Sequence, residues 1–256
     1  MSAAVRERYA GRVALVTGGA SGIGEACCRR LASEGARLGI IDIETAAAER
    51  VAASLRASGA DVFVASCDVT DAAATASAIH AVATHFGRLD VAINNAGIAG
   101  VLVPMTDYPP DTWNRVLAVN LSGVFHCMRA ELPIMAKQGG GAVVNMASIL
   151  GTVGFAGAAA YVAAKHGVIG LTRTAALEFG PAGIRVNAVC PSFIQTPLTL
   201  GPLPDGETWD ALAALHPLKR CARPEEVAAA VAFLGSEDAS YMNGSVEIVD
   251  GGYTAG

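Results

Sequence analysis

A tyrosine and a lysine stand four positions apart in the segment Tyr161-Val162-Ala163-Ala164-Lys165, and Ser148 precedes the tyrosine by thirteen residues. Residues four apart on a helix share a face, so the phenol and the ammonium group would lie together. A free phenol has a pKa of roughly 10, and using it as a base near pH 7 requires about 4 kcal/mol of phenolate stabilisation. A nearby cation is one source of it. The alternative for these residues alone is a surface Tyr and Lys on an amphipathic helix.

Ser148 is expected at the end of a strand, because it follows the apolar run 142–147. In open α/β sheets, ligands bind at the carboxyl ends of the strands. A loop and the helix that carries Tyr161 and Lys165 could therefore bring all three side chains together over a bound substrate.

The amino-terminal region predicts a strand, a glycine loop and a helix. The β-rich run 12–17 is followed by Gly18-Gly19-Ala20-Ser21-Gly22-Ile23-Gly24 and by a helical pattern that extends to about Ser33. Glycines let the backbone approach a pyrophosphate closely, and a helix N-terminus stabilises its charge. A second strand, 38–42, ends in Asp42, twenty residues after Gly22, where the 2′-hydroxyl of a ribose would be held.

Strands and helices alternate along the next part of the chain, which favours right-handed βαβ units. Helices are expected over 45–57 and from Asp71, as N-cap, to about Phe86, with Gly87 closing the second one. Strands are expected over 62–65 and 89–93. Asp68 follows the first of these strands and could hold the adenine edge of a nucleotide or only form a turn.

Five motifs together resemble the short-chain dehydrogenase/reductase family, over nearly the whole chain. The family's nucleotide motif T-G-x-x-x-G-x-G is similar to residues 17–24, and its N-N-A-G is present at 94–97. Its catalytic asparagine falls on Asn120, within a long helix expected from Asp111 to about Lys137. Its serine and its Y-x-x-x-K fall on Ser148 and on residues 161–165.

The alternation of elements and this resemblance predict an α/β fold: a Rossmann-like, doubly wound parallel sheet of seven strands with helices on both faces, in a single domain over 1–256. The sixth and seventh strands are expected at 183–189 and 246–249. The segment 197–218, rich in Leu and Pro, is expected to form a substrate lid.

The resemblance implies reversible hydride transfer between a nicotinamide and a carbinol carbon. Tyr161 would exchange the proton as general acid/base, and Lys165 would lower its pKa and bind the nicotinamide ribose. Ser148 would orient the substrate oxygen. Asn120 would hold a water that relays the proton, unless its amide serves only the backbone.

The cofactor is expected to be NAD, because Asp42 would repel a 2′-phosphate and neither Ile43 nor Ser21 offers a guanidinium group. Ser192 stands where the family usually has glycine in its P-G-x-I-x-T segment, which bears on the dihedral angles of that turn. The residues expected to bind the cofactor are Gly18, Ser21, Gly22, Ile23, Gly24, Asp42, Asp68, Val69, Asn95, Ala96, Gly97, Tyr161, Lys165, Pro191, Ile194 and Thr196.

The composition of the chain argues against several classes of protein. The chain has a net charge of −5 and no cluster of basic residues, which argues against a nucleic-acid partner. Its six cysteines show no metal-site spacing and are expected to be reduced and mostly buried; no metal is expected. The amino-terminus is charged where a secretory signal would be apolar, and no apolar stretch is long enough to span a membrane, so the cytoplasm is expected.

The expected substrate is a small uncharged secondary alcohol, such as a cyclic alcohol or a diol, or its ketone. The segments expected to line the site contain no Lys or Arg, and an unpaired buried anion would be costly. Their apolar side chains are Ile149, Leu150, Val153, Phe155, Leu198, Leu200, Leu203 and Trp209.

Two other functions remain as alternatives. A 3-oxoacyl-thioester reductase of the fatty-acid type would dock an acidic carrier through basic residues, but this chain has Gly139 and Ala182 at the positions expected for them. A dinucleotide-sensing regulator without catalysis could lose the phenol or the lysine, and both are present. A purely structural protein would need no glycine loop.

A homo-oligomer, specifically a homotetramer, is expected from the apolar surface of two helices. These helices, at 111–137 and 160–179, pair between subunits in the family that the chain resembles. Their apolar residues exceed what one side of a sheet covers. The residues are Val116, Leu117, Val124, Phe125, Leu171 and Phe179.

Overall fold

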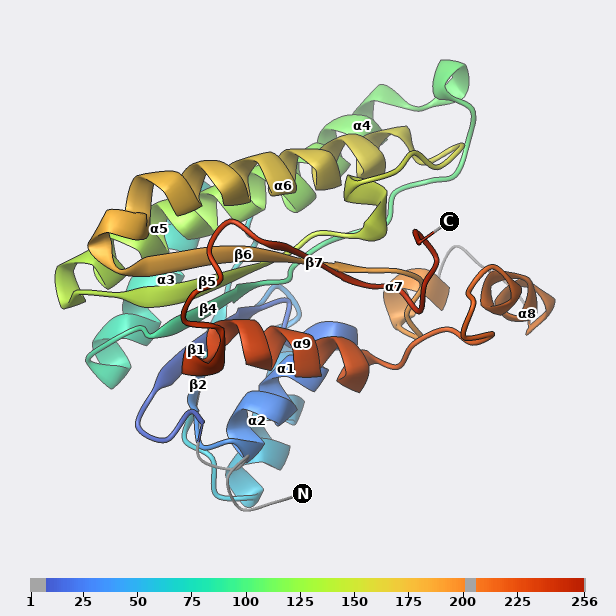
Figure 1. Ribbon diagram of the computed structural model, residues 1–256. Coiled ribbons are helices and arrows are strands. Elements are labelled where there is room, and N and C mark those ends of the chain that lie inside the picture. The colour runs from blue at the N-terminus through green and yellow to red at the C-terminus, as the bar shows by residue number, and fades with distance from the viewer. Residues whose placement is uncertain (1–7, 201–205, 256) are drawn as a thin grey trace.

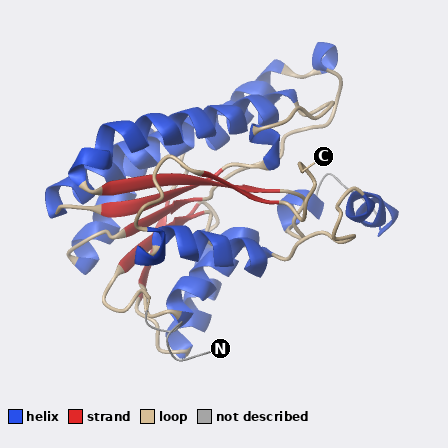
Figure 2. Cartoon of the chain, viewed as in Figure 1, coloured by secondary structure: helices blue, strands red, loops and turns tan. Residues whose placement is uncertain are grey.

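A computed structural model describes residues 8–200 and 206–255. For residues 200 and 206–208 it describes the backbone only. In the described residues seven parallel strands form one sheet in the order β3-β2-β1-β4-β5-β6-β7. Helices cover both faces of the sheet (Figures 1 and 2). The predicted doubly wound fold is therefore confirmed.

The strands lie within two residues of their predicted bounds. All five residues of β1 are buried, since neighbouring strands flank it and helices cover both its faces. The strands are β1 Val13–Thr17, β2 Arg37–Asp42, β3 Val62–Ser66, β4 Val91–Asn94, β5 Gly141–Met146, β6 Ile184–Pro191 and β7 Val246–Val249.

Two helical layers sandwich the sheet, and each layer has its own apolar core. One layer comprises α1 Gly22–Ser33, α2 Thr45–Ala57 and α9 Pro224–Gly235. The other comprises α3 Ala72–Phe86, α4 Pro110–Leu117, α5 Gly123–Gln138 and α6 Ala159–Phe179. Two further helices, α7 Pro197–Leu200 and α8 Gly206–Ala214, follow β6 and lie beyond the carboxyl ends of the strands (Figure 1).

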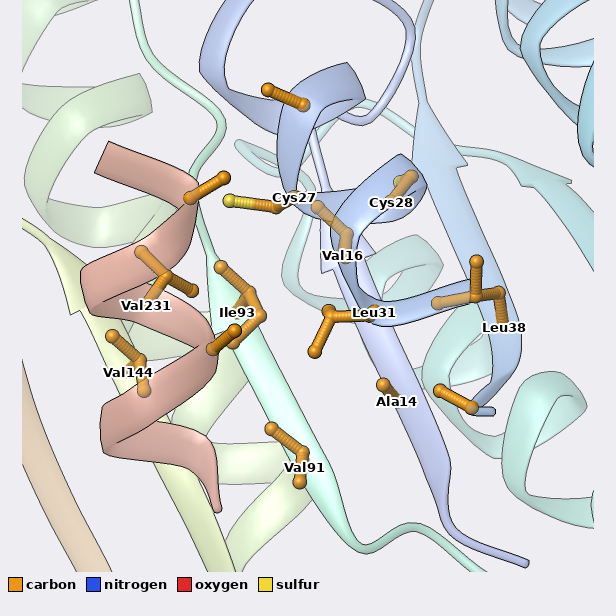
Figure 3. Close-up of a cluster of buried hydrophobic side chains, with 14 of the residues drawn as sticks. Ala14, Val16, Cys27, Cys28, Leu31, Leu38, Val91, Ile93, Val144 and Val231 are labelled. Atoms are coloured by element: carbon orange, nitrogen blue, oxygen red, sulfur yellow. The ribbon is translucent and has the colours of Figure 1, made fainter. Parts of the chain in front are cut away.

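The core beneath α1 and α9 holds the glycine loop against the sheet. Leu31 of α1 and Val231 of α9 are fully buried over Val16 and Ile93, on the neighbouring strands β1 and β4 (Figure 3). Burying such a side chain contributes roughly 1.5–3 kcal/mol. All six cysteines, including Cys27 in this core, are buried free thiols, as expected.

Local sequence signals set the ends of α3. The carboxylate of Asp71 accepts hydrogen bonds from the backbone N–H groups of Ala73 and Ala74, which otherwise lack helical partners. At the other end, Gly87 adopts a left-handed conformation with φ of 78°, which glycine tolerates best. Both predicted boundaries are confirmed.

The helix predicted over 111–137 is continuous but not uniform. Between α4 and α5 the chain forms a π-helical turn over Ala118–Ser122, with αR backbone on both sides. Asn120 lies within this turn. Such turns occur where a helix accommodates a functional residue. The helix continues through Pro133 to Gln138.

A chain of polar side chains crosses the core between the sheet and α5 and α6. Asn94 Nδ2 lies 3.1 Å from Glu131 Oε2 and 3.0 Å from Asn145 Oδ1, and Asn145 Nδ2 donates to the Thr172 hydroxyl at 3.0 Å. Glu131 is fully buried, and its Oε1 has no hydrogen-bond partner. Burial raises the pKa of Glu131 to about 8, against the lowering effect of the Asn94 hydrogen bond.

Over the described ranges, no helix combines the length and the apolar character needed to cross a membrane. Within those same residues, no three His, Cys, Asp or Glu side chains gather in a way that could hold a metal ion.

Replacing Glu131 by Gln should remove a pH-dependent cost of folding. The folded protein holds the Glu131 proton between the unfolded pKa of 4.5 and about 8. The free energy of unfolding therefore falls as pH rises through that window, by up to about 1.4 kcal/mol per pH unit. The Glu131→Gln variant keeps a neutral side chain, so its stability advantage over wild type should grow from pH 5 to pH 8 in urea unfolding.

The matched control is Glu178→Gln, which alters an exposed side chain on α6. Its stability difference from wild type should stay near zero at every pH. An advantage of Glu131→Gln that does not change with pH would contradict the raised pKa.

Candidate active site

A cavity of about 500 Å³ opens at the carboxyl ends of the strands, where the strand order reverses between β1 and β4. It reaches from the glycine loop to Tyr161 and Lys165. Of the predicted cofactor residues all but Gly24 line it. The other lining residues, which were not among those predicted to bind the cofactor, are Ile41, Ile43, Cys67, Ile98, Arg115, Val119, Met146, Ala147, Ser148, Ser192, Pro197, Leu198 and Thr199.

The glycine loop has the close approaches that a dinucleotide site requires. Gly18 has a φ of 65°, and a Cβ there would lie 2.8 Å from Ala96 Cα. Gly22 has a φ of 54° and opens α1, whose first N–H groups face the loop end. Gly24 does not line the cavity. It allows α1 to pack closely on the loop, because a Cβ on it would lie 1.9 Å from the Gly18 carbonyl oxygen. The loop therefore fits a bound pyrophosphate.

Asn95 ties the end of β4 to the start of the glycine loop. Its Nδ2 donates to the carbonyl oxygens of Thr17 and Gly18, at 3.1 and 3.0 Å. In return, Thr17 Oγ1 accepts from the backbone N–H groups of Asn95 and Ala96, at 3.1 and 3.2 Å. Thr17 thus has a role that sequence reasoning missed, although its place in the motif was the available signal.

Two carboxylates lie along the outer part of the cavity. Asp42 accepts hydrogen bonds from the N–H groups of Ala20 and Glu44, both at 2.9 Å, which fix its charge at the end of β2. Asp68 accepts from Thr70 N at 2.9 Å and so forms a turn, while it also lines the cavity. Hydrogen bonds from Thr70 lower the pKa of Asp68. The two roles considered for Asp68 are therefore compatible.

Ser148 and Tyr161 line the large cavity and also a smaller, mostly apolar cavity of about 140 Å³. Ser148 follows β5 and caps a short 3₁₀ turn, since its Oγ accepts from Leu150 N at 3.2 Å. Tyr161 lies in the first turn of α6. A group that bridges both cavities can act on a substrate in one cavity and a cofactor in the other.

Lys165 lies one turn after Tyr161 on α6, as predicted, and its Nζ is 5.5 Å from the centroid of the phenol ring. The side chain is buried, and Nζ donates to the Met146 carbonyl oxygen at 2.6 Å. Burial lowers the pKa of Lys165 to about 8.

The expected lowering of the Tyr161 pKa by Lys165 is not present in this structure. Burial instead raises the pKa of Tyr161 to about 12, although a hydrogen bond with Ser148 acts in the opposite direction. The physical reason is that desolvation disfavours the charged form of both groups. The phenol is therefore protonated near pH 7, ready to donate rather than to accept.

Asn120 lies apart from both cavities and is fully buried. Its Oδ1 accepts from Ile98 N, and its Nδ2 donates to Ile98 O, both at 2.8 Å. The amide therefore fixes the loop that follows Gly97 at the edge of the large cavity. This contact matches the backbone role that was the alternative for Asn120.

The last residue of β6 and the residues just after it lie near the inner end of the large cavity. Pro191, Ile194 and Thr196 are buried and line it, as predicted. Ser192 does not take a left-handed conformation, because Lys219 is the one non-glycine residue with positive φ in the described ranges. Serine therefore fits this turn without the backbone freedom of glycine.

Four of the residues expected to line the substrate site lie around the smaller cavity. Ile149, Leu150, Phe155 and Leu198 line it, while Val153 and Trp209 do not. Leu203 lies outside the described residues, as does the side chain of Leu200. The lining residues not foreseen are Ala99, Gly100, Leu102, Ala158, Ser192, Phe193, Thr199 and Leu212.

Comparisons with known proteins agree with this geometry. A family model described as enoyl-(acyl carrier protein) reductase matches residues 18–254. Cis-4-hydroxycyclohexanecarboxylate dehydrogenase of Sinomonas cyclohexanicum is 47% identical over 97% of this chain and 99% of its own. Cyclohexanol dehydrogenase of Acinetobacter sp. (strain SE19) is 40% identical over the full length of both.

A solved structure of levodione reductase superposes with a TM-score of 0.93, at 41% identity over 96% of this chain and 99% of that one. These relatives are dehydrogenases and reductases that match this chain from end to end. The chain therefore belongs to the short-chain dehydrogenase/reductase family, oxidoreductases that act on CH–OH groups with a nicotinamide dinucleotide cofactor.

Proposed function

We propose that this protein is an NAD-dependent dehydrogenase that interconverts a small, uncharged secondary alcohol and its ketone. The observation that carries the proposal is the position of Tyr161 and Ser148. Both residues line the dinucleotide-sized cavity and the small apolar cavity beside it. A proton donor or acceptor at that junction can serve the oxygen of a substrate bound in the small cavity.

Each catalytic residue has a distinct task in this proposal. When bound, the nicotinamide supplies or accepts the hydride. Tyr161 gives a proton to the ketone oxygen or takes one from the alcohol, and Ser148 orients that oxygen. Lys165 provides the positive charge that a phenolate requires. Asn120 holds the backbone at Ile98, and a role in a water relay remains part of the proposal.

Three features support NAD over NADP. Asp42 is held at the end of β2 by two backbone N–H groups, so its negative charge cannot readily move away from a 2′-phosphate. Its neighbour Ile43 is exposed and offers no cation. Arg115, on the cavity wall, acts electrostatically on Asp68 and helps to lower the pKa of that carboxyl.

The small cavity supports an uncharged substrate. Its lining includes no Lys or Arg among the described side chains, and the segment 197–218 contains neither residue. A buried carboxylate would therefore lack a partner. Relatives named for cyclohexanol, D-threitol and meso-2,3-butanediol support a compact alcohol or diol. The relative named for a hydroxycyclohexanecarboxylate favours a carboxylated rival.

An acyl-carrier substrate is the second candidate, favoured by the description of the matching family model. The absence of basic residues at Gly139 and Ala182 does not exclude a carrier. Gly139 and Ala182 lie just before β5 and β6, at the amino-terminal edge of the sheet and far along the strands from the cavities. Their lack of charge therefore says nothing about the entrance to the site. The net charge of −5 still disfavours an acidic carrier.

Three further features belong to the proposal. Residues 197–218 act as the substrate lid of one catalytic domain over 1–256; Leu198 and Leu212, from α7 and α8, line the small cavity. The protein is placed in the cytoplasm, a compartment that suits its six free thiols. It assembles as a homotetramer.

The residues available for contacts between subunits differ from those expected from the sequence. Val116 and Val124 are buried inside the protomer, and Leu117, Leu171 and Phe179 pack against its cores. On the outer face formed by α5 and α6 (Figure 1), Phe125 is 47% exposed and Leu177 is 81% exposed. These two side chains remain for contacts between subunits.

The function and the cofactor are tested in one assay, reduction of NAD or NADP with cyclohexanol, diols, hydroxysteroids, a hydroxycyclohexanecarboxylate and a 3-hydroxyacyl thioester. We expect turnover of uncharged alcohols, with kcat/KM at least about tenfold higher for NAD, which corresponds to about 1.4 kcal/mol. Asp42→Ala should lower this preference. Equal rates with NADP would contradict the cofactor, and activity confined to the thioester or the carboxylate would contradict the substrate.

Tyr161→Phe should lower kcat at least about a hundredfold, because general acid/base catalysis contributes 10²–10⁴. Its NAD affinity, measured by fluorescence titration, should stay near that of wild type. Lys165→Ala should weaken both turnover and NAD binding. Tyr241→Phe and Lys137→Ala, at exposed positions, are the matched controls. A Tyr161→Phe enzyme that keeps more than a few per cent of the rate would refute the assigned acid/base.

Sedimentation equilibrium at micromolar concentration should give a species of four chains. Leu177→Glu should shift the distribution toward smaller species, because it places a charge in the proposed contact. A wild-type monomer would rule out the tetramer.

A further inference from the structure

One polar pair outside the catalytic residues lies at the junction of the two cavities. Ser192, which follows β6, lines both cavities, and its Oγ lies 2.9 Å from His216 Nε2. His216 is 1% exposed and follows α8. The contact therefore joins the carboxyl end of the sheet to the last part of the segment 197–218, the proposed lid.

Hydrogen bonding fixes the tautomer of His216. Its Nδ1 lies 2.8 Å from the carbonyl oxygen of Leu212, an atom that can only accept. Nδ1 must therefore carry a proton, and Nε2 of the neutral ring is an acceptor. The Ser192 hydroxyl consequently donates its one hydrogen to His216, and Ser192 Oγ faces other partners with lone pairs only.

Aromatic contacts hold the imidazole in this orientation. The ring of Phe193 lies edge-on to His216 at 6.1 Å between centroids, and Tyr253 lies 5.4 Å away. Phe193 also contacts Phe155, another residue that lines the small cavity, at 6.0 Å between centroids. A buried ring with packed neighbours cannot turn freely, so the direction of the Ser192 hydrogen bond is set in advance.

Few polar side chains line the small cavity. Ser148 and Tyr161 serve the reacting oxygen in the proposed function, which leaves Ser192 and Thr199 among the described side chains that line it. The Thr199 hydroxyl lies 3.3 Å from that of Thr196. Of these two hydroxyl groups, that of Ser192 donates its hydrogen to a buried base, His216. An acceptor left without a donor when substrate fills the cavity would cost about 1–3 kcal/mol.

We propose that Ser192 Oγ accepts a hydrogen bond from a second hydroxyl group of the substrate, and that His216 positions it for this task. The enzyme then prefers a diol or a hydroxyketone to the matching monoalcohol or ketone. A carboxylate, which only accepts hydrogen bonds, finds no donor in Ser192. This inference rests on the proposed function, since it assigns a partner to the second oxygen of a substrate in the same site.

The test compares kcat/KM for cyclohexanol with that for 1,2-, 1,3- and 1,4-cyclohexanediol. Wild type should favour at least one diol. Ser192→Ala and Ser192→Gly should lower the ratio of kcat/KM for that diol to kcat/KM for cyclohexanol about tenfold or more. Glycine is tolerable there because it removes only the side chain at an ordinary backbone conformation. Ser54→Ala, at an exposed position on α2, is the matched control.

His216→Leu removes the acceptor and should lower the diol preference as well. Combining it with Ser192→Ala should add little, because both changes break one interaction. If cyclohexanol is oxidised and the diol preference is absent or survives Ser192→Ala, this inference fails while the proposed function stands. If wild type oxidises none of these alcohols, both fail.

Discussion

The reciprocal hydrogen bonds between Asn95 and Thr17 are the contact on which the site depends. They join the ends of β1 and β4, the two central strands between which the sheet reverses its order. On one side of this contact, residues from the glycine loop to Asp68 line the outer part of the large cavity. On the other side, residues from Ser148 to Thr196 line its inner part, which holds Tyr161. A shift at Asn95 would separate the two halves.

Burial shapes the chemistry of the inner half. It raises the pKa of Tyr161 to about 12 and lowers that of Lys165 to about 8, so both groups are driven toward their neutral forms. Glu131, in the core that supports α5 and α6, is driven the same way. The protein thus keeps Lys165 and Glu131 out of water, while Tyr161 is half-buried and lines both cavities. A phenolate at Tyr161 therefore needs a positive charge nearby.

Most of the fold and the cofactor site could be predicted because repeated local signals coincide with the parallel topology. Strand runs, the glycine loop and the Asp71 cap are properties of neighbouring residues. Contacts between distant segments could not be predicted: the Asn120–Ile98 pairing, the burial of Val116 and Val124, and the Ser192–His216 hydrogen bond. Each depends on packing between elements, which no local pattern encodes.

The residues of the site are also synthesised at different times, because they follow strands that lie far apart along the chain. The glycine loop, Asp42 and Asp68 belong to the first seventy residues, and β4 adds Asn95 soon afterwards. Ser148, Tyr161, Lys165 and Thr196 emerge from the ribosome only later. Because a domain generally folds as a unit, a nascent chain that already carries the glycine loop, Asp42 and Asn95 still lacks every group proposed to react with a substrate until β5 and α6 have been made.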